Sequence, residues 1–233
     1  MMLHPLETTA LLLSLKVSVF AVALILIPGV AAGWLLARRD FPGKSLFDGL
    51  VHLPLVVPPV VTGYLLLYLF SPGGPVGGPL RDFTGLTIAF TWQGAALAAG
   101  IVAFPLLVRS VRLSIEAIDL RLEWAARTLG KGPMAVFFRI TLPLAAPGLL
   151  AGTVLAFARC LSEFGATITF VANLPGETQT LPIAIYTALQ VPGGEAAATR
   201  LSIVAVVLAF VALIASEWLA RRLRSRLGLH SNA

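Results

Sequence analysis

The chain has 233 residues, of which 58% are hydrophobic and only 12% are charged, and its mean hydropathy is +0.90. Soluble domains carry about 25% charged residues, so this composition excludes an ordinary soluble protein and indicates an integral membrane protein. The net charge of +6 requires no nucleic-acid partner, because the positions of the basic residues explain it. The single cysteine, Cys160, excludes an intrachain disulfide, and we interpret it as a small buried apolar residue.

Five long apolar stretches predict five membrane-spanning helices. About 20 apolar residues in a helix cross roughly 30 Å of hydrocarbon. Lipid offers no hydrogen-bond partner to free backbone groups, which favours helices over open strands. The first stretch lacks a cationic start and a small-residue cleavage site, so we expect it to remain in the mature chain. The predicted spans cover residues 11–37, 46–70, 84–108, 144–172 and 201–220.

Basic residues collect on one side of these spans. Three lie between spans one and two, six between spans three and four, and four after span five, whereas the opposite connections hold only Arg81 and Arg200. Lys and Arg are retained in the cytoplasm during insertion, so the pattern predicts an outer amino terminus and a cytoplasmic carboxyl terminus. The polar connection over residues 109–143 is then cytoplasmic.

Two spans contain residues that are costly in a membrane helix. Pro58 and Pro59, followed by Gly63, interrupt the second span, which we expect to be kinked or locally unwound. Arg159 and Glu163 are four residues apart in the fourth span, on one helical face where they can pair. We therefore regard these residues as candidates for the translocation path or its gate: Pro58, Pro59, Arg159 and Glu163. A static kink and an ion pair that only satisfies itself remain open as alternatives.

The polar connection over 109–143 has a helical pattern of its own. Apolar residues recur at helical intervals over 112–128 and predict an amphipathic helix, which Gly130 should end. A second short helix is expected over 134–140. We interpret the segment either as an interfacial element that stabilises the bundle or as a knob that fits a groove of a soluble motor.

Two outer connections differ in character. Residues 71–83 are rich in Pro and Gly and predict an outer turn. Residues 181–189 are apolar but too short to cross a membrane, so we expect a short outer or re-entrant helix there.

The segment EWAARTLGKGPMAVFFRITLP resembles the EAA loop of ABC-importer permeases. The family pattern reads EAA, three residues, Gly, nine residues, Ile, one residue, Leu-Pro. Trp124 occupies the position of the pattern's glutamate, and the chain has its glutamate one residue earlier. The resemblance implies an ATPase-coupling loop that contains Glu123, Ala125, Ala126, Gly130, Ile140, Leu142 and Pro143.

Longer stretches, among them LVHLPLVVPPVVTGYLLL, ARCLSEFGATITF and PGETQTLPIAIYTALQVPGGE, resemble the molybdate permease (ModB) family. This implies an all-α, five-span bundle of the type I, MetI-like permease class in the bacterial inner membrane. It implies one permease domain over 1–233 that carries the cytoplasmic coupling loop over 109–143. It also implies a homodimer that works with two cytoplasmic ABC ATPase subunits and a periplasmic or extracellular oxyanion-binding protein.

The implied function is import of molybdate, or tungstate, by alternating access. The chain has no GxxxxGK[ST] loop, so we expect ATP and Mg²⁺ to bind the partner ATPase. We expect no catalytic residue, metal or cofactor in this chain, and lipid rather than nucleic acid around it.

Alternatives of two kinds remain open. Sulfate, thiosulfate or other oxyanion permeases share the EAA loop and parts of SEFGA. An ion-coupled secondary transporter would need intramembrane carboxylates, for which Glu163 and Glu217 are candidates. An intramembrane enzyme is not favoured, because the three histidines are far apart in sequence and neither HExxH nor GxSxG occurs.

Overall fold

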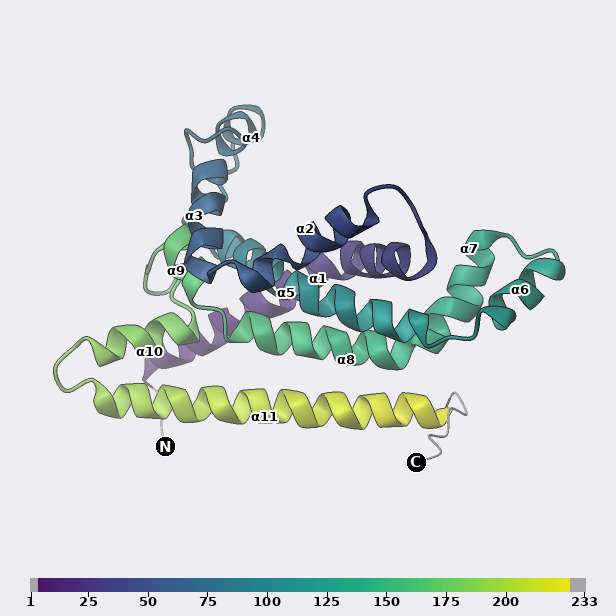
Figure 1. Cartoon of the computed structure of the whole chain (residues 1–233). Helices are drawn as coiled ribbons and strands as arrows, with labels where there is room; N and C mark the ends of the chain where they lie inside the picture. The colour runs from purple at the N-terminus through teal and green to yellow at the C-terminus, as the bar shows by residue number, and fades with distance from the viewer. Residues whose placement is uncertain (1–3, 227–233) are drawn as a thin grey trace.

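The computed structural model describes residues 4–226, and this part of the chain forms helices and turns without a β-strand (Figure 1). The predicted all-α class is confirmed. In chain order the elements are α1 (Pro5–Arg38), α2 (Lys44–Val56), α3 (Pro59–Phe70), α4 (Gly77–Thr84), α5 (Trp92–Glu116), α6 (Leu120–Thr128), α7 (Pro133–Val136), the π-helix η1 (Phe137–Thr141), α8 (Leu142–Leu161), α9 (Gly165–Val171), α10 (Leu181–Leu189) and α11 (Glu195–Arg226).

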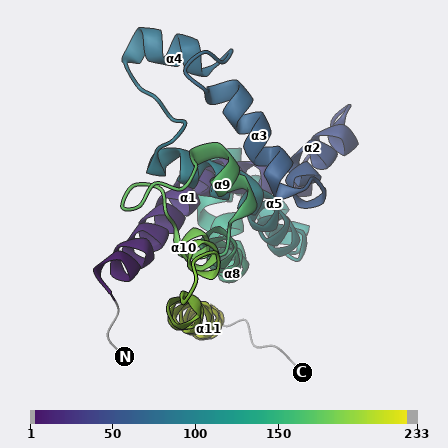
Figure 2. The same cartoon turned by 90° about the vertical axis from the view of Figure 1, so that its left-hand side faces the viewer.

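The core lies where α1, α5 and α8 pack together (Figures 1 and 2). Small residues allow this approach: a Cβ added to Gly29 or Gly33 of α1 would lie 2.7 Å from a side-chain carbon of Leu107 or Val111 of α5. Between helices in lipid there is little hydrophobic drive, so close van der Waals packing of this kind holds the bundle together.

Within residues 4–226, four helices are long and apolar enough to cross a membrane, and α2 with α3 makes a fifth span if the bent pair counts as one. That pair is bent by 110°, which confirms the predicted interruption of the second span. Pro59 opens α3, where its missing amide donor costs no helical hydrogen bond. The first and fifth predicted spans lie inside α1 and α11, and the short helix over 181–189 is confirmed as α10.

The third predicted span is shifted along the chain. α5 begins at Trp92, eight residues later than predicted, because Gly85 ends α4 in the left-handed region and Thr91 caps α5. α5 then continues to Glu116, eight residues past the predicted end, since buried side chains such as Val111 extend its apolar face.

The fourth predicted span, 144–172, is wrong at both ends. α8 stops at Leu161, and the Glu163 carboxylate starts a separate helix, α9, by accepting the N–H of Ala166 at 2.8 Å. At the other end α7, η1 and α8 form one membrane helix that begins at Pro133. The separate helix expected over 134–140 is therefore the first part of this span.

The polar connection holds one separate helix rather than two. The amphipathic helix predicted over 112–128 is divided, because Asp119 caps α6 by accepting the N–H of Arg121 at 2.9 Å. α6 projects from one end of the bundle (Figure 1). At the other end the outer turn predicted over 71–83 contains the short helix α4.

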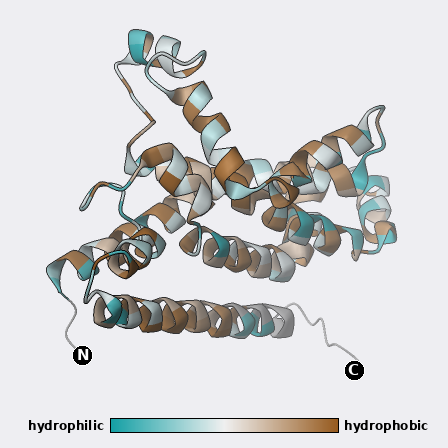
Figure 3. Ribbon diagram, turned by 60° about the vertical axis from the view of Figure 1, so that its left-hand side comes forward, coloured by the Kyte–Doolittle hydropathy of each residue, from teal (hydrophilic) through white to brown (hydrophobic). Residues whose placement is uncertain are grey.

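α11 lies along one side of the bundle and is apolar for most of its length (Figures 2 and 3). Only 11% of its most apolar stretch of 18 residues is buried against the rest of the chain. Its beginning is tied to α1 by Arg200, whose Nη2 donates to Glu7 Oε1 at 2.6 Å. An exposed apolar helix of this kind suits contact with lipid or with another subunit.

The packing of α3 on α9 leads to a stability prediction. A Cβ at Gly63 would lie 2.5 Å from the Ala166 carbonyl oxygen, whereas a Cβ at Gly49 of α2 would meet nothing within 4 Å. Because of overpacking, Gly63→Ala should lower the free energy of unfolding by about 1–3 kcal/mol. Each kcal/mol should lower Tm by about 2–4 °C. Unfolding can be followed by heating the protein in detergent with a fluorescent maleimide. The single cysteine, Cys160, is buried, so it is labelled only when the bundle opens. Equal melting of Gly63→Ala and the control Gly49→Ala would contradict the packing.

Candidate functional site

α6 has two faces of unusual character. Of its nine residues only Glu123 and Ala126 are buried, so the charged side chain faces the bundle. Large apolar side chains are exposed on α6, on the following turn and on η1. Large exposed apolar side chains on a polar connection suit contact with a partner. This apolar patch consists of Leu122, Trp124, Leu129, Met134 and Phe138, each between 49% and 81% exposed.

The Glu123 carboxylate is held inside the chain by two donors. Arg38 Nε, at the end of α1, donates to Glu123 Oε1 at 3.0 Å, and Thr141 Oγ1 of η1 donates to the same oxygen at 3.0 Å. Arg38 Nη2 also donates to the carbonyl of Ile118, between α5 and α6, at 3.2 Å. The side chains of Arg38 and Glu123 are 9% and 6% exposed. We call this group the Arg38–Glu123–Thr141 cluster.

Sequence reasoning missed this cluster. Arg38 counted only as one of several basic residues next to span one, and it lies 85 residues from Glu123. Thr141 fills the unspecified position between the Ile and the Leu-Pro of the EAA pattern. Neither position carries a local signal for the pairing.

The other predicted coupling residues lie along one continuous segment. Ala125 and Gly130 are exposed, and Ala126 is buried against the bundle. Three more, Ile140, Leu142 and Pro143, are half-buried where the fourth span begins. Gly130 has φ of 78°, and its N–H and that of the next residue bond back to α6 carbonyls, which forms a glycine-dependent helix end.

The break in the second span lies next to the junction between α8 and α9. α3 packs on α9, and a Cβ at Gly165 would lie 2.9 Å from Cβ of Pro59 (Figure 1). Pro58 and Pro59 mark the break, and the junction follows the end of α8 at Leu161. Arg159 Nη2 and Glu163 Oε2 are 2.7 Å apart, which confirms the predicted ion pair. The Glu163 side chain is 1% exposed, whereas that of Arg159 is 27% exposed.

A second polar cluster joins α2 to α5. Arg112 Nη1 lies 2.9 Å from Asp48 Oδ2, and Arg112 Nε lies 2.8 Å from Glu116 Oε1. His52 Nδ1 is 3.0 Å from Asp48 Oδ1. Asp48 and His52 lie on α2, the first half of the broken span. Both are partly exposed, and Asp48 also ties this half of the span to α5 through Arg112.

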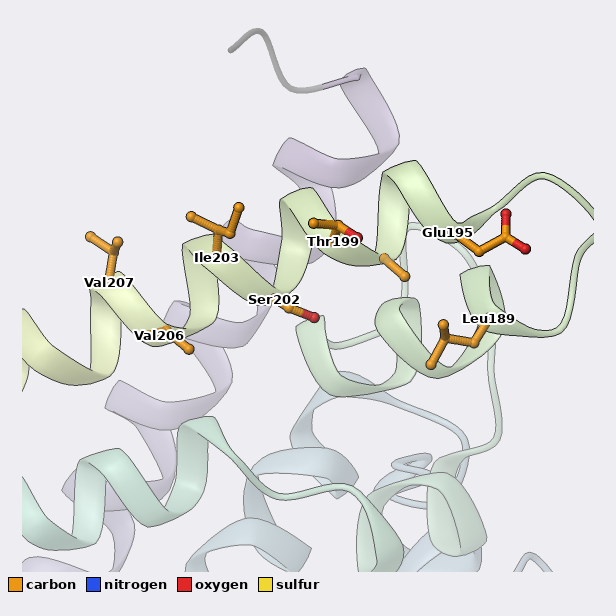
Figure 4. Close-up of a pocket in the computed structure, with 8 residues that line it drawn as sticks. Leu189, Glu195, Thr199, Ser202, Ile203, Val206 and Val207 are labelled. Carbon is orange, nitrogen blue, oxygen red and sulfur yellow. The ribbon is translucent and has the colours of Figure 1, made fainter.

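Two hollows near the opposite end of the bundle are not lined by a group of side chains arranged for catalysis. One, of about 440 Å³, is a groove beside α10 and the start of α11, lined mainly by apolar groups such as Ile203 and Val207 (Figure 4). The other, of about 290 Å³, includes Lys16, whose Nζ lies 3.7 Å from the centroid of the Trp92 ring. Within residues 4–226, no three His, Cys, Asp or Glu side chains are arranged to hold a metal ion.

Comparison with known proteins identifies close similarities of sequence. Residues 29–225 match the family described as "Binding-protein-dependent transport system inner membrane component". The chain is 58% identical over 222 residues to the molybdenum transport system permease protein ModB of Escherichia coli K12, which covers 95% of this chain and 97% of that protein. Identity to the ModB protein of Haemophilus influenzae is 52% over the same shares. A sulfate transport system permease protein, CysW of Synechococcus elongatus, is 40% identical over 75% of this chain and 60% of its own length.

Solved structures with the same fold are more distant in sequence. The inward-facing MetNI methionine ABC transporter matches with a TM-score of 0.74 at 17% identity, over 95% of this chain and 99% of that one. A bacterial alginate ABC transporter, in complex with a periplasmic protein bound to an alginate pentasaccharide, matches with a TM-score of 0.72 at 19% identity. This match covers 92% of this chain and 78% of that one. The predicted MetI-like fold and the resemblance to ABC-importer permeases are confirmed.

The Arg159–Glu163 pair leads to a second stability prediction. Glu163→Ala removes both the partner of Arg159 and the acceptor for the Ala166 N–H. Removal of one partner from a buried pair costs about 3–5 kcal/mol, and partial exposure of Arg159 favours the lower end. Glu163→Gln keeps an acceptor and should retain more of the stability. The fraction that stays monodisperse after heating measures this, with the exposed Glu177→Ala as control. An alanine variant as stable as the control would contradict the stabilising role of Glu163.

Proposed function

We propose, since the chain belongs to the family of inner membrane components of binding-protein-dependent transport systems, that it is the permease subunit of an ABC importer for molybdate. The observation that carries this conclusion is the 58% identity to a molybdenum permease over 95% of the chain. The chain is a multi-pass protein of the inner membrane.

The alternatives have weaker support. The sulfate permease relative is 40% identical over a smaller part of the chain, so molybdate is favoured over sulfate. A secondary transporter needs a carboxylate free to bind its coupling ion. Glu163 is committed to Arg159 and to the backbone, and Glu217 Oε1 lies 2.7 Å from Arg221 Nε.

The assembly that we propose has two copies of this chain, two cytoplasmic ABC ATPase subunits and an external oxyanion-binding protein. Thirteen basic residues on one side of the predicted spans against two on the other support an outer amino terminus and a cytoplasmic carboxyl terminus. Under this orientation the apolar patch of the coupling loop over 109–143 is the ATPase surface. The chain lacks a phosphate-binding loop, so ATP and Mg²⁺ bind the ATPase, and the permease itself is not a catalyst.

Transport in this proposal proceeds by alternating access. ATP-driven closure of the ATPase pair moves the coupling loop and hence the start of the fourth span, which α7, η1 and α8 build as one helix. We assign the path or its gate to the break and the adjoining junction, at Pro58, Pro59, Arg159 and Glu163. Arg159 can attract an oxyanion only weakly, because Glu163 neutralises it, and weak attraction permits rapid release.

The proposed function predicts a defined pattern of uptake. Proteoliposomes that contain this chain with its ATPase and binding protein should accumulate molybdate only when ATP is present on the ATPase side. Sulfate at the same concentration should accumulate more slowly, and tungstate tests the breadth of the anion site. Uptake at full rate without the ATPase would contradict the proposal, as would a preference for sulfate.

Gly130 provides a test of the turn that follows α6, which we call the elbow. Its φ of 78° disfavours other residues by about 1–2 kcal/mol, although no atom would crowd a Cβ there. Gly130→Val should therefore displace α6 and lower anion uptake per ATP hydrolysed, with the bundle still folded. Gly130→Asn is the matched control, because Asn tolerates the left-handed region. Unchanged uptake and unchanged anion-stimulated ATPase activity in Gly130→Val would contradict the role of this elbow.

A further inference from the structure

The coupling helix α6 has very little apolar contact to hold it in place. Its nine residues bury only Glu123 and Ala126, and the alanine offers a single methyl group. Helices shorter than about 12 residues are marginal on their own. The position of α6 therefore depends on what Glu123 contacts.

Glu123 joins three parts of the chain at one oxygen. Its Oε1 accepts from Arg38 of α1 and from Thr141 of η1, while Arg38 also holds the carbonyl of Ile118 just before α6. The end of α1, the α5–α6 connection and the start of the fourth span thus meet through one carboxylate. No residue of the apolar patch takes part in these bonds.

The burial of the pair makes the cluster act as a unit. With the Arg38 and Glu123 side chains 9% and 6% exposed, separation would leave each charge in a poorly solvated place. Replacement of such a pair by apolar groups need not lower stability, so its contribution is a fixed geometry more than a net free energy.

The elements on the inner side of the cluster can carry a displacement of α6 into the bundle. Trp34, one turn before Arg38, packs edge-to-face on Phe137 of η1, with ring centroids 6.0 Å apart. In η1 the N–H of Leu142 bonds to the carbonyl of Phe137, five residues back. Such widened turns are common at functional sites, and here the turn lies between the cluster and the fourth span.

We propose that Arg38, Glu123 and Thr141 are positioning residues that lock α6 to α1 and to the fourth span, so that motion of α6 moves these helices without slack. This inference rests on the proposed function. It assigns Glu123 to the inside of the permease, in contrast to the ATPase contact that the EAA resemblance implies for it.

The first experiment tests, in the permease alone, whether the cluster holds α6 in place. Amide hydrogen exchange is measured for residues 118–130 of the reconstituted full chain, with Arg38→Gln, Glu123→Gln and the control Arg39→Gln. Arg39 is exposed, and its guanidinium lies 5.7 Å from the Trp34 ring centroid, outside the cluster. Both cluster variants should speed exchange of α6 by about tenfold, equivalent to about 1.4 kcal/mol. Exchange equal to that of the control would overturn the lock, whether or not the chain transports molybdate.

The second experiment reads the consequence for coupling. In the complete transporter, Arg38→Gln and Glu123→Gln should each raise the ATP hydrolysed per anion imported. The double variant should be no worse than the worse single variant, because the two residues act together. Affinity of the ATPase for the permease should stay unchanged in all three. Thr141→Val, which keeps the ion pair, should give a smaller effect in the same direction.

Two outcomes would overturn the proposal. If Glu123→Gln weakens ATPase binding while Arg38→Gln does not, Glu123 is a direct ATPase contact. If the cluster variants keep the wild-type ratio of ATP to anion, the cluster has no part in coupling. Slow maleimide labelling of the buried Cys160 establishes in each case that the variant bundle is folded. Failure of the wild-type complex to transport would count against the proposed function and leaves the exchange result standing.

Discussion

A helix that ends inside a membrane leaves polar backbone groups without water, and this constraint governs how the whole bundle is built. The chain interrupts its second span at Pro58 and Pro59, and it packs α3 on α9, the short helix that follows the fourth span, with Gly63 allowing the close approach. Pro59 has no amide proton to satisfy, and Glu163 accepts the free N–H of Ala166. The α1, α5 and α8 core stays continuous beside α3 and α9. On the proposed function, this arrangement gives the importer two short helices that can move while the core remains fixed.

The proposed coupling helix α6 buries a charged residue and exposes an aromatic one. Glu123 faces inward and is paired, whereas its neighbour Trp124 is 58% exposed. An exposed apolar patch supplies contact area to a partner, while a buried ion pair supplies a defined geometry. On the proposed function, contact with the ATPase and transmission of its motion thus fall to different side chains of the same short helix. The shift of the glutamate by one position from the family pattern fits this division, because one residue changes the direction of a side chain on a helix by about 100°.

Local patterns in the sequence were sufficient for much of this architecture. Apolar runs predicted the number of spans, and adjacent prolines predicted the break before Pro59. The end of α8 at Leu161 could not be predicted from composition, since an apolar run follows Glu163 and hides the break. The bond between Arg38 and Glu123 joins residues 85 positions apart and exists only in the folded chain. A motif reports which residue occurs at a position, but its direction depends on tertiary contacts.

The charge within the spans also bears on where the anion is selected. Of the basic residues in the interior of the predicted spans, Lys16 lies over the Trp92 ring and Arg159 is paired with Glu163. On the proposed function, a dianion on this route meets no concentrated positive charge among them, from which we infer that the permease binds it weakly and releases it readily. A permease of this design discriminates poorly between tetrahedral oxyanions of the same charge. Discrimination then has to occur before the anion enters the membrane, in the external binding protein, whose backbone and hydroxyl donors can be fixed to fit one anion. This explains in physical terms why permeases for different oxyanions can remain similar in sequence while their transport systems differ in substrate.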